Sequence, residues 1–254
     1  MCSHYISERR RAYYLRHYGI VIPADWEAPR DSSHVYPTQR APVVRRPLAR
    51  ESGDEAVPEF EAVMAHFGLL PGFAKDLKYG LRTYNARSET VASLDSFKHA
   101  WAKSRFCIVP CEAIYEPDWR SGAHVPTRFS AANDETLGVA GLWQPWRAPN
   151  GEWLTSFAML TINADTHPLM KHMHRPDAAR PPEQQDKRMV VILPEAQYGE
   201  WLDASPQQAM AFMHQYPAER LAMTAEPLPP KAPKPTRKKP PAGEPPAGGN
   251  LPLF

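Results

Sequence analysis

The sequence has few cysteines and no long hydrophobic run. Its 254 residues include three cysteines, an odd and small number that argues against a disulfide framework and is typical of a reducing compartment. No apolar stretch approaches the about 20 residues that a membrane-spanning helix needs, and no secretory hydrophobic region follows the N-terminus. We therefore expect a cytoplasmic protein without a membrane partner.

A strong net charge is also absent. Thirty Lys and Arg against 28 Asp and Glu give a net charge of +2, so bulk charge does not indicate a nucleic-acid binder. Basic residues nevertheless gather over residues 9–16, 40–50 and 75–87. Such runs are typical either of a solvated face or of a path for phosphates.

The composition changes sharply near the C-terminus. Hydrophobic residues make up 43% and charged residues 23% of the chain, which is ordinary for a globular protein. Residues 1–225 are therefore predicted to form one domain. Residues 226–254 are rich in proline and basic residues and have almost no apolar periodicity. We predict a disordered or polyproline-like tail there, because it cannot bury enough surface to offset its chain entropy.

The domain is predicted to have an α+β fold. A first helix is predicted from Ser7, as N-cap, to His17, with Gly19 at the stop position. Further helices are predicted over 93–104, 194–205 and 206–216. Segments rich in β-branched and aromatic residues predict strands over 41–47, 63–70, 106–116, 136–143, 156–164 and 188–194. Many strands and few helices favour a mostly antiparallel, curved or barrel-like sheet with a few flanking helices.

Cysteine directly follows the initiator methionine in MCSHYISERR, residues 1–10. Removal of Met1 would leave an α-amine and a thiol on adjacent carbons of Cys2. An aldehyde that condenses with this amine gives an imine, which the thiol traps as a five-membered thiazolidine. The pKa of an α-amine is about 7.7–8.0, against about 10.4 for lysine, so more of it is neutral near neutral pH. The alternative is that Cys2 is a small apolar residue at a frayed end.

The segment YNARSET, residues 84–90, offers two polar side chains at a spacing of two. In an extended segment Asn85 and Arg87 would point to one face. An amide beside a guanidinium suits a sugar hydroxyl next to a phosphate. The alternative is a loop asparagine that fixes its own turn and an arginine in solvent.

A carboxylate stands near the end of the apolar run CIVPCEAIYE. Burial of Glu116 would raise its pKa toward a value useful for proton transfer, and Pro117 is predicted to end the strand there. Glu112, four residues earlier, lies on the same side of an ideal strand. A simple pair of edge charges is therefore the alternative to a catalytic role.

Three histidines, His167, His172 and His174, lie within eight residues of one another in HPLMKHMH. No HExxH motif is present, and Cys107 and Cys111 have no second cysteine pair, so we predict neither a metal site nor any other cofactor. A histidine near a carboxylate suits proton transfer near neutral pH.

Together these motifs resemble the SRAP family, the SOS-response-associated peptidase-like proteins that crosslink themselves to abasic sites in single-stranded DNA. The resemblance covers about residues 1–200. The segments that carry it, in order, are Met1-Cys2, HVYPTQRAPVV (34–44), HFGLLPGFAKD (66–76), YNARSET (84–90), RFCIVPCEAIYE (105–116), AGLW (140–143) and HMHRPD…KRMVVILP (172–194).

The resemblance implies a SRAP fold and a mechanism. The freed amine of Cys2 would condense with the aldehyde of a ring-opened abasic sugar, a lyase-type Schiff-base step, and the thiol would close the thiazolidine. Asn85 would hold the opened sugar, and Glu116 would assist proton transfer at the amine. His174, chosen over His172 because LMKHMH matches the family's phrasing, would protonate the ring oxygen or the departing group. The peptidase activity of the family would be limited to self-processing, and a monomer is expected.

The predicted DNA contacts include departures from the family pattern. Arg87 would contact phosphate, as would His4, which supplies part of the charge of the arginine usual at that position. Ser3 replaces a usual glycine, and residues 175–186 form an insertion after His174. Phe73, beside Leu70 and Pro71, would form a wedge against flanking bases, with packing at a strand end as the alternative, and Lys75 lies in the adjoining basic run.

Two other functions compete with this hypothesis. One is a noncovalent single-stranded DNA-binding module that has lost crosslinking. The other is a protease acting on other proteins, for which the sequence shows no substrate pocket. The partner expected under the leading hypothesis is single-stranded DNA that contains abasic sites, a substrate that can bend sharply without breaking a base pair.

Overall fold

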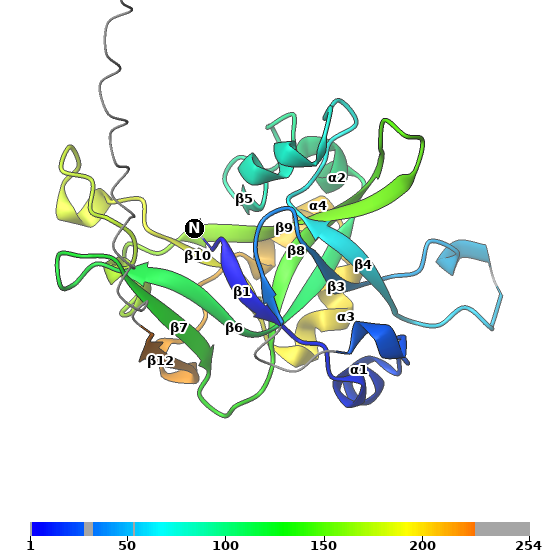
Figure 1. Ribbon diagram of the computed structural model, residues 1–254, viewed down its shortest axis with the longest axis horizontal. Coiled ribbons are helices and arrows are strands. Elements are labelled where there is room, and N and C mark those ends of the chain that lie inside the picture. The colour runs from blue at the N-terminus through cyan, green and yellow to red at the C-terminus, as the bar shows by residue number, and fades with distance from the viewer. Residues whose placement is uncertain (1, 28–32, 53, 227–254) are drawn as a thin grey trace, which may run out of the picture.

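The structure, a computed structural model, describes residues 2–27, 33–52 and 54–226. Strands dominate the described chain (Figure 1). They are β1 His4–Ser7, β2 His34–Val35, β3 Arg40–Arg45, β4 Glu61–Phe67, β5 Asn85–Arg87, β6 Phe106–Asp118, β7 Val125–Ala131, β8 Leu137–Arg147, β9 Trp153–Asn163, β10 Arg188–Val190, β11 Ile192–Leu193 and β12 Leu221–Ala225.

The helices are short and flank the sheet (Figure 1). The α-helices are α1 Arg11–Tyr18, α2 Lys98–Ala102, α3 Tyr198–Asp203 and α4 Pro206–Ala209. The 3₁₀ turns are η1 Ala24–Trp26, η3 Arg50–Ser52, η4 Leu77–Arg82, η5 Met170–His172, η6 Pro182–Gln184, η7 Glu195–Gln197, η8 Met210–Phe212 and η9 Ala218–Arg220. In the described part of the chain, no helix is both long and apolar enough to cross a membrane.

Five strands close into a mixed barrel, which confirms the predicted barrel-like α+β fold. Around the barrel the pairs are β6–β8, β8–β9, β9–β4, β4–β3 and β3–β6. Four of these pairs are antiparallel, and β4 with β9 is parallel. Closure leaves these five strands without a free edge.

The long strand β6 connects the barrel to the remaining strands. Its first half, Phe106 to Cys111, pairs with β8, and its second half, from Ile114 onward, pairs with β7. β1 pairs with the middle of β6. The first described residues of the chain are thus bound to the strand that carries Glu116.

Aromatic side chains fill the core. Phe67 of β4 stacks on Phe157 of β9 with ring centroids 5.2 Å apart, and Tyr5 meets Phe67 edge-on at 5.3 Å. Trp201 of α3 packs against Phe106 and donates a hydrogen bond of 2.9 Å from Nε1 to the carbonyl of Cys107. All five aromatic rings are almost fully buried, and such rings dominate core energetics.

The start of the first helix differs from the prediction. Ser7 lies in β1, and the N-cap of α1 is Arg10. The reason is that the backbone of Ser7 pairs with β6, while the carboxylate of Glu8 accepts a hydrogen bond from the Arg10 backbone N–H at 2.7 Å. Gly19 takes the left-handed conformation (φ 67°) and ends α1, as predicted.

Other predicted elements are shorter or divided. The helix expected over 93–104 is α2, of five residues, and the strand expected over 188–194 divides into β10 and β11. Val191 makes this division, because its N–H donates to Leu160 of β9 and its carbonyl accepts from Ala140 of β8. β1, β2, β5, β7 and β12 were not predicted as strands. Of the predicted tail, residues 227–254 lie outside the described residues.

Candidate active site

The structure brings Cys2, Asn85, Glu116 and His174 to one place. Cys2 leads into β1, Asn85 begins β5, Glu116 is near the end of β6, and His174 follows η5. Asn85 bonds to the backbone of Cys2, Glu116 pairs with His174, and the charge of Glu116 acts on the thiol of Cys2. These contacts join residues that are far apart in the sequence.

Cys2 is fully buried. Its Sγ–H donates a hydrogen bond of 3.4 Å to the carbonyl of His4. Burial raises the pKa of the Cys2 thiol well above its usual value, and the negative charge of Glu116 raises it further. The thiol is therefore protonated at neutral pH, and a proton acceptor is needed when its sulfur forms a bond.

Asn85 holds the backbone of Cys2. Its Nδ2 donates to the carbonyl oxygen of Cys2 at 2.7 Å, and β5 is held in place by its parallel pairing with β9, Asn85 opposite Met159. The Oδ1 of Asn85 is buried and accepts no hydrogen bond from any described residue. A buried unsatisfied oxygen costs free energy, so this atom is suited to accept a hydrogen bond from a ligand.

Glu116 and His174 are hydrogen-bonded to each other. His174 Nε2 lies 2.8 Å from Glu116 Oε2, and the Glu116 side chain is almost completely buried. Burial alone would raise the pKa of Glu116, as the sequence led us to expect. Nearby positive charge and the hydrogen bond with His174 outweigh burial, and they lower the pKa of Glu116 below its usual value. Glu116 is therefore a carboxylate at neutral pH, which corrects the expectation of a raised pKa.

The backbone of His174 is held in an unusual conformation. Its φ of 62° lies in the left-handed region, which is uncommon for a residue other than glycine. Its N–H donates to the carbonyl of Pro117 at 2.7 Å, and Lys187 Nζ donates to the carbonyl of His174 at 2.8 Å. Such conformations persist where the surroundings fix them, and they concentrate at functional sites.

Pro117 does not end β6, contrary to the prediction. The strand continues to Asp118, because Pro117 faces Pro126 of β7 and its carbonyl is used by His174. Glu112 also differs from the simple edge pair considered above. Its Oε1 lies 3.9 Å from Arg10 Nε, whereas Glu116 pairs with His174.

His167, Cys107 and Cys111 have structural surroundings, whereas His172 is exposed. His167 is buried, and its Nδ1 accepts hydrogen bonds from the backbone at Leu169 and Met170. Cys107 and Cys111 are free and buried in β6. Within the described residues no group of three or more His, Cys, Asp or Glu side chains could hold a metal ion.

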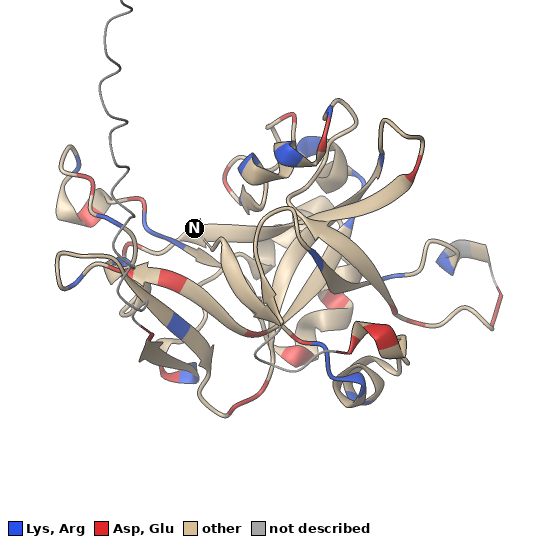
Figure 2. Ribbon diagram, in the orientation of Figure 1, with Lys and Arg blue, Asp and Glu red and all other residues tan. Residues whose placement is uncertain are grey.

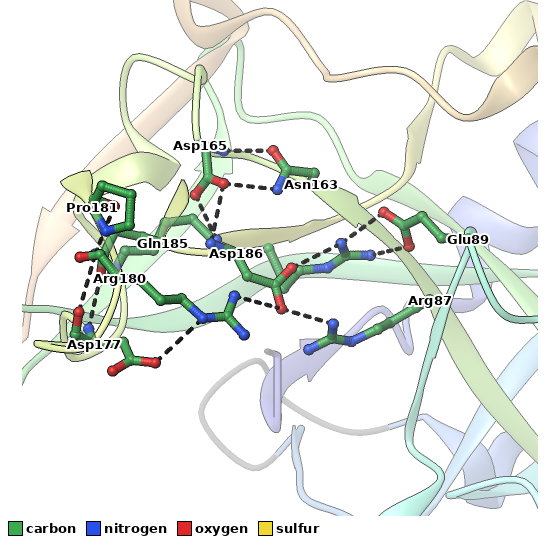
Figure 3. Close-up of polar contacts among 11 residues, drawn as sticks. Arg87, Glu89, Asn163, Asp165, Asp177, Arg180, Pro181, Gln185 and Asp186 are labelled. Carbon is green, nitrogen blue, oxygen red and sulfur yellow. Dashed lines mark hydrogen bonds and ion pairs between the residues drawn. The ribbon is translucent and has the colours of Figure 1, made fainter. Parts of the chain in front are cut away.

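Arg87, predicted to contact phosphate, is paired with a carboxylate of its own chain. Its Nη1 lies 2.8 Å from Oδ2 of Asp186, the last residue of the insertion (Figure 3). Arg180 Nη1 and Arg188 Nη1 also approach this carboxylate, at 3.8 Å and 3.4 Å. Arg188 is held further by Glu89 at 2.8 Å. Asp186 was not predicted from the sequence, although its position in the insertion was a signal.

His4 is not placed as a charged group. Its Nε2 shares a hydrogen bond of 2.6 Å with His34 Nδ1. Burial and the neighbouring His34 lower the pKa of His4 from 6.5 to about 4. His4 is therefore neutral near neutral pH, and its predicted contact with phosphate would use a hydrogen bond without a full positive charge.

The predicted wedge is only partly exposed. Phe73 is 56% exposed and meets Tyr79 edge-on, whereas Leu70 and Pro71 are buried. Lys75 is exposed on the same loop. Charges of both signs are interspersed over the ribbon (Figure 2), and they do not outline a path for DNA. The DNA contacts expected from the sequence therefore stay predictions, namely those of Arg87, His4, Phe73 and Lys75.

Chemically, the site can hold a ligand and move protons. It has a buried carboxylate paired with a histidine, a buried amide oxygen that can accept a hydrogen bond, and a thiol on the second residue of the chain. Burial strengthens electrostatic interactions among these groups. The arrangement therefore suits addition of a nucleophile to a polarised carbon with transfer of protons.

Comparisons with known proteins show the relatives of this chain. A family model described as SOS response associated peptidase (SRAP) matches residues 1–228. The abasic site processing protein YoqW of Bacillus subtilis is 29% identical over 159 residues, which cover 60% of this chain and 63% of YoqW. The abasic site processing protein HMCES of Mus musculus is 26% identical over 181 residues, covering 58% of this chain and 47% of HMCES.

Solved structures share the fold. A protein from Bordetella bronchiseptica is 41% identical, with a TM-score of 0.74, over 89% of this chain and 100% of that chain. A protein from Bacteroides thetaiotaomicron is 18% identical with a TM-score of 0.68, over 88% of this chain and 91% of that chain. The second likeness concerns the fold alone.

Proposed function

Because the chain belongs to the SOS response associated peptidase (SRAP) family, we propose that it processes abasic sites in single-stranded DNA by forming a covalent link through Cys2. The observation that carries the proposal is the geometry at Asn85. The Nδ2 of Asn85 donates a hydrogen bond of 2.7 Å to the carbonyl oxygen of Cys2, and the Oδ1 of the same amide is buried without a hydrogen bond from a described residue. The names of YoqW and HMCES as abasic site processing proteins also support it.

The proposed reaction begins with the amino terminus. Hydrolysis of the Met1–Cys2 peptide bond frees the α-amine of Cys2, and we limit the peptidase activity to this self-processing. The amine nitrogen then attacks the aldehyde carbon of the opened sugar. Loss of one water gives an imine, the Schiff base of lyase-type chemistry.

The thiol completes the link. The S–H of Cys2 adds across the C=N bond, so that sulfur bonds to carbon and nitrogen receives a proton. The product is a thiazolidine, and the whole sequence from amine and aldehyde releases one water. Since the raised pKa of the Cys2 thiol keeps it protonated, a group that accepts its proton accelerates this step.

Glu116 and His174 are assigned the proton transfers. Glu116 is ionised and acts on Cys2 electrostatically, so it serves as the base toward the amine and then the thiol. His174, 2.8 Å from Glu116, protonates the ring oxygen when the sugar opens and the hydroxyl that leaves as water. Asn85 positions Cys2 and accepts a hydrogen bond from a sugar hydroxyl through Oδ1.

A gel experiment separates the two chemical steps. The purified protein is mixed with a single-stranded oligonucleotide that carries one abasic site, with and without borohydride, and run under denaturing conditions. The wild-type protein is expected to give a shifted band in both samples. Cys2→Ala keeps an amine when Met1 is removed but lacks the thiol, so its band should survive only after reduction with borohydride. Equal bands for both proteins without borohydride would contradict a role for the thiol.

A noncovalent DNA-binding module is the second candidate. It is favoured by the complete burial of Cys2, which restricts access of a sugar to the thiol. Under this alternative the oligonucleotide shifts the protein in native gels, whereas denaturing gels show no covalent band with or without borohydride.

A further inference from the structure

Three aromatic rings form a stack next to the candidate active site. The ring of His4 lies between Tyr36 and Tyr115, with centroids 4.3 Å and 4.1 Å away and interplanar angles of 12° and 11°. The ring of His34 lies 4.9 Å from His4 and shares its hydrogen bond. Near-parallel rings at these separations are attractive contacts.

Tyr36 is the outer member of this stack. It is 47% exposed, and among the described residues no ring other than His4 is stacked on it. Its backbone is fixed in a turn, because its N–H donates to Gln39 Oε1 at 2.8 Å and its carbonyl accepts from the Gln39 N–H at 3.0 Å. The ring is therefore held at the surface by a preorganised backbone and by the rings behind it.

The stack is uncharged near neutral pH. The pKa of His4 is lowered to about 4, and burial, together with the hydrogen bond to Glu226, raises the pKa of Tyr115 above its usual value. A neutral aromatic surface attracts a nucleobase by stacking and is tolerant of sequence, because every base has a flat π face. It is poorly suited to bind a phosphate.

The position of the stack relates it to the lesion. His4 is two residues from Cys2, and it pairs in the sheet with Tyr115, which directly precedes Glu116. A strand whose abasic sugar reached Cys2 would bring the neighbouring nucleotide to this end of β1. An abasic sugar has no base of its own, so the flanking unpaired base is the aromatic group available for stacking.

We propose that Tyr36, supported by His4 and Tyr115, is a stacking platform for the unpaired base that flanks the abasic site. This inference rests on the proposed function, because it takes single-stranded DNA as the ligand. It assigns Tyr36 to binding and positioning of the DNA. The competing interpretation is that the stack only packs the β2–β3 turn against β1.

Fluorescence of a base analogue tests the platform directly. Full-length protein is titrated into single-stranded oligonucleotides with a stable abasic analogue, which cannot react, and 2-aminopurine on its 5′ or its 3′ side. We expect quenching for one of the two positions. Tyr36→Ala should lose this quenching and bind about tenfold more weakly, Tyr36→Phe should retain both, and Tyr36→Trp should bind at least as tightly as the wild type.

The controls keep the proposal falsifiable. Trp153→Ala, which removes an aromatic ring that is 67% exposed in the β8–β9 hairpin, should change neither quenching nor affinity. Quenching and affinity that are unchanged in Tyr36→Ala would overturn the platform. If Tyr36→Ala lowers the melting temperature, the platform is judged from the folded variants Tyr36→Phe and Tyr36→Trp. A loss of quenching in Tyr36→Phe would then overturn the platform.

The outcome is separable from that of the proposed crosslink. The same variants are mixed with an oligonucleotide carrying a reactive abasic site and run on a denaturing gel. A missing covalent band for every protein, with quenching that still depends on the ring at residue 36, would reject the crosslink and retain the platform. A normal band with quenching independent of residue 36 would do the reverse.

Discussion

At the scale of single residues, Asn85 joins β5 to the backbone of Cys2. Asn85→Ala removes the hydrogen bond to the Cys2 carbonyl and the unpaired Oδ1. Loss of such a bond costs about 1 kcal/mol, so we expect the crosslinking rate to fall about fivefold or more, measured by a time course on denaturing gels. Asn150→Ala, at an exposed turn, is the matched control. An unchanged rate in Asn85→Ala would show that this amide neither positions Cys2 nor holds the sugar.

The lowered pKa of His4 predicts that the stability of the protein depends on pH. Between about pH 6.5 and pH 4, the unfolded chain binds a proton at His4 that the folded chain does not, because the folded pKa is lowered to about 4. Stability should therefore fall as the pH falls through this range. In His4→Phe the melting temperature should depend less steeply on pH there.

The pH profile of His4→Phe needs an exposed histidine for comparison. His214→Phe, at an exposed position, should leave the wild-type slope in place. Should His4→Phe lose stability as steeply as the wild type between these pH values, His4 is not the group that takes up the proton. The groups facing His4 are His34, Tyr36 and Tyr115.

At the scale of elements, the insertion 175–186 places a carboxylate against Arg87. The Asp186 carboxylate pairs with Nη1 of Arg87 at 2.8 Å, so it competes with a DNA phosphate for this guanidinium. Asp186→Asn should tighten noncovalent binding of single-stranded DNA about three- to tenfold at low salt. The slope of log K against log salt should steepen by about one unit.

Asp177→Asn provides the comparison for Asp186→Asn. Asp177 pairs with Arg180 at 3.4 Å within the same insertion. The substitution Asp177→Asn therefore removes an equal charge without removing a partner of Arg87. We expect a smaller effect. Weaker binding by Asp186→Asn than by the wild type would mean that Asp186 is needed to position Arg87.

Gly68 and Gly80 pack closely against each other in the segment between β4 and β5. Gly68 has a φ of 118°, and a Cβ atom there would lie 2.4 Å from the carbonyl oxygen of Gly80. Gly68→Ala should destabilise the protein by about 2 kcal/mol or more, measured by urea unfolding. Gly72→Ala, where a Cβ meets no atom within 4 Å, should be nearly neutral. Equal stability of the two variants would contradict this close packing.

The sequence predicted long elements better than short ones. The apolar run that forms β6 and the stop at Gly19 could be recognised locally. β1, β2 and β5 have four residues or fewer, and their conformation is determined by pairing with distant strands. Ser7 is an example, because a good N-cap residue is taken into a strand by its pairing with β6.

The residues of the candidate site were chosen from the sequence, whereas the contacts among them could not be predicted. The residue patterns made Cys2, Asn85, Glu116 and the histidine cluster candidates, and the family resemblance gave them roles and chose His174 within the cluster. The bond between Asn85 and Cys2 spans 83 positions of sequence, so only the fold could reveal it. The lowered pKa of Glu116 and the capture of Arg87 by Asp186 likewise follow from charges that the fold brings together.

At the scale of the whole molecule, a strand of the closed barrel holds the segment that carries Cys2. β1 is bound along the middle of β6, so the first described residues are held beside the strand that carries Glu116. Under the proposed function, fixing Cys2 and Glu116 in this way lowers the entropy lost in the reaction. The account therefore requires that residue 2 become the first residue of the active protein.

Intact mass spectrometry of the protein, before and after incubation with an abasic oligonucleotide, tests this requirement most directly. The account predicts a chain without Met1, and then an adduct whose mass equals the sum of that chain and the oligonucleotide less one water. A protein that retains Met1, or that gains no adduct under conditions in which it binds the oligonucleotide, would contradict the account.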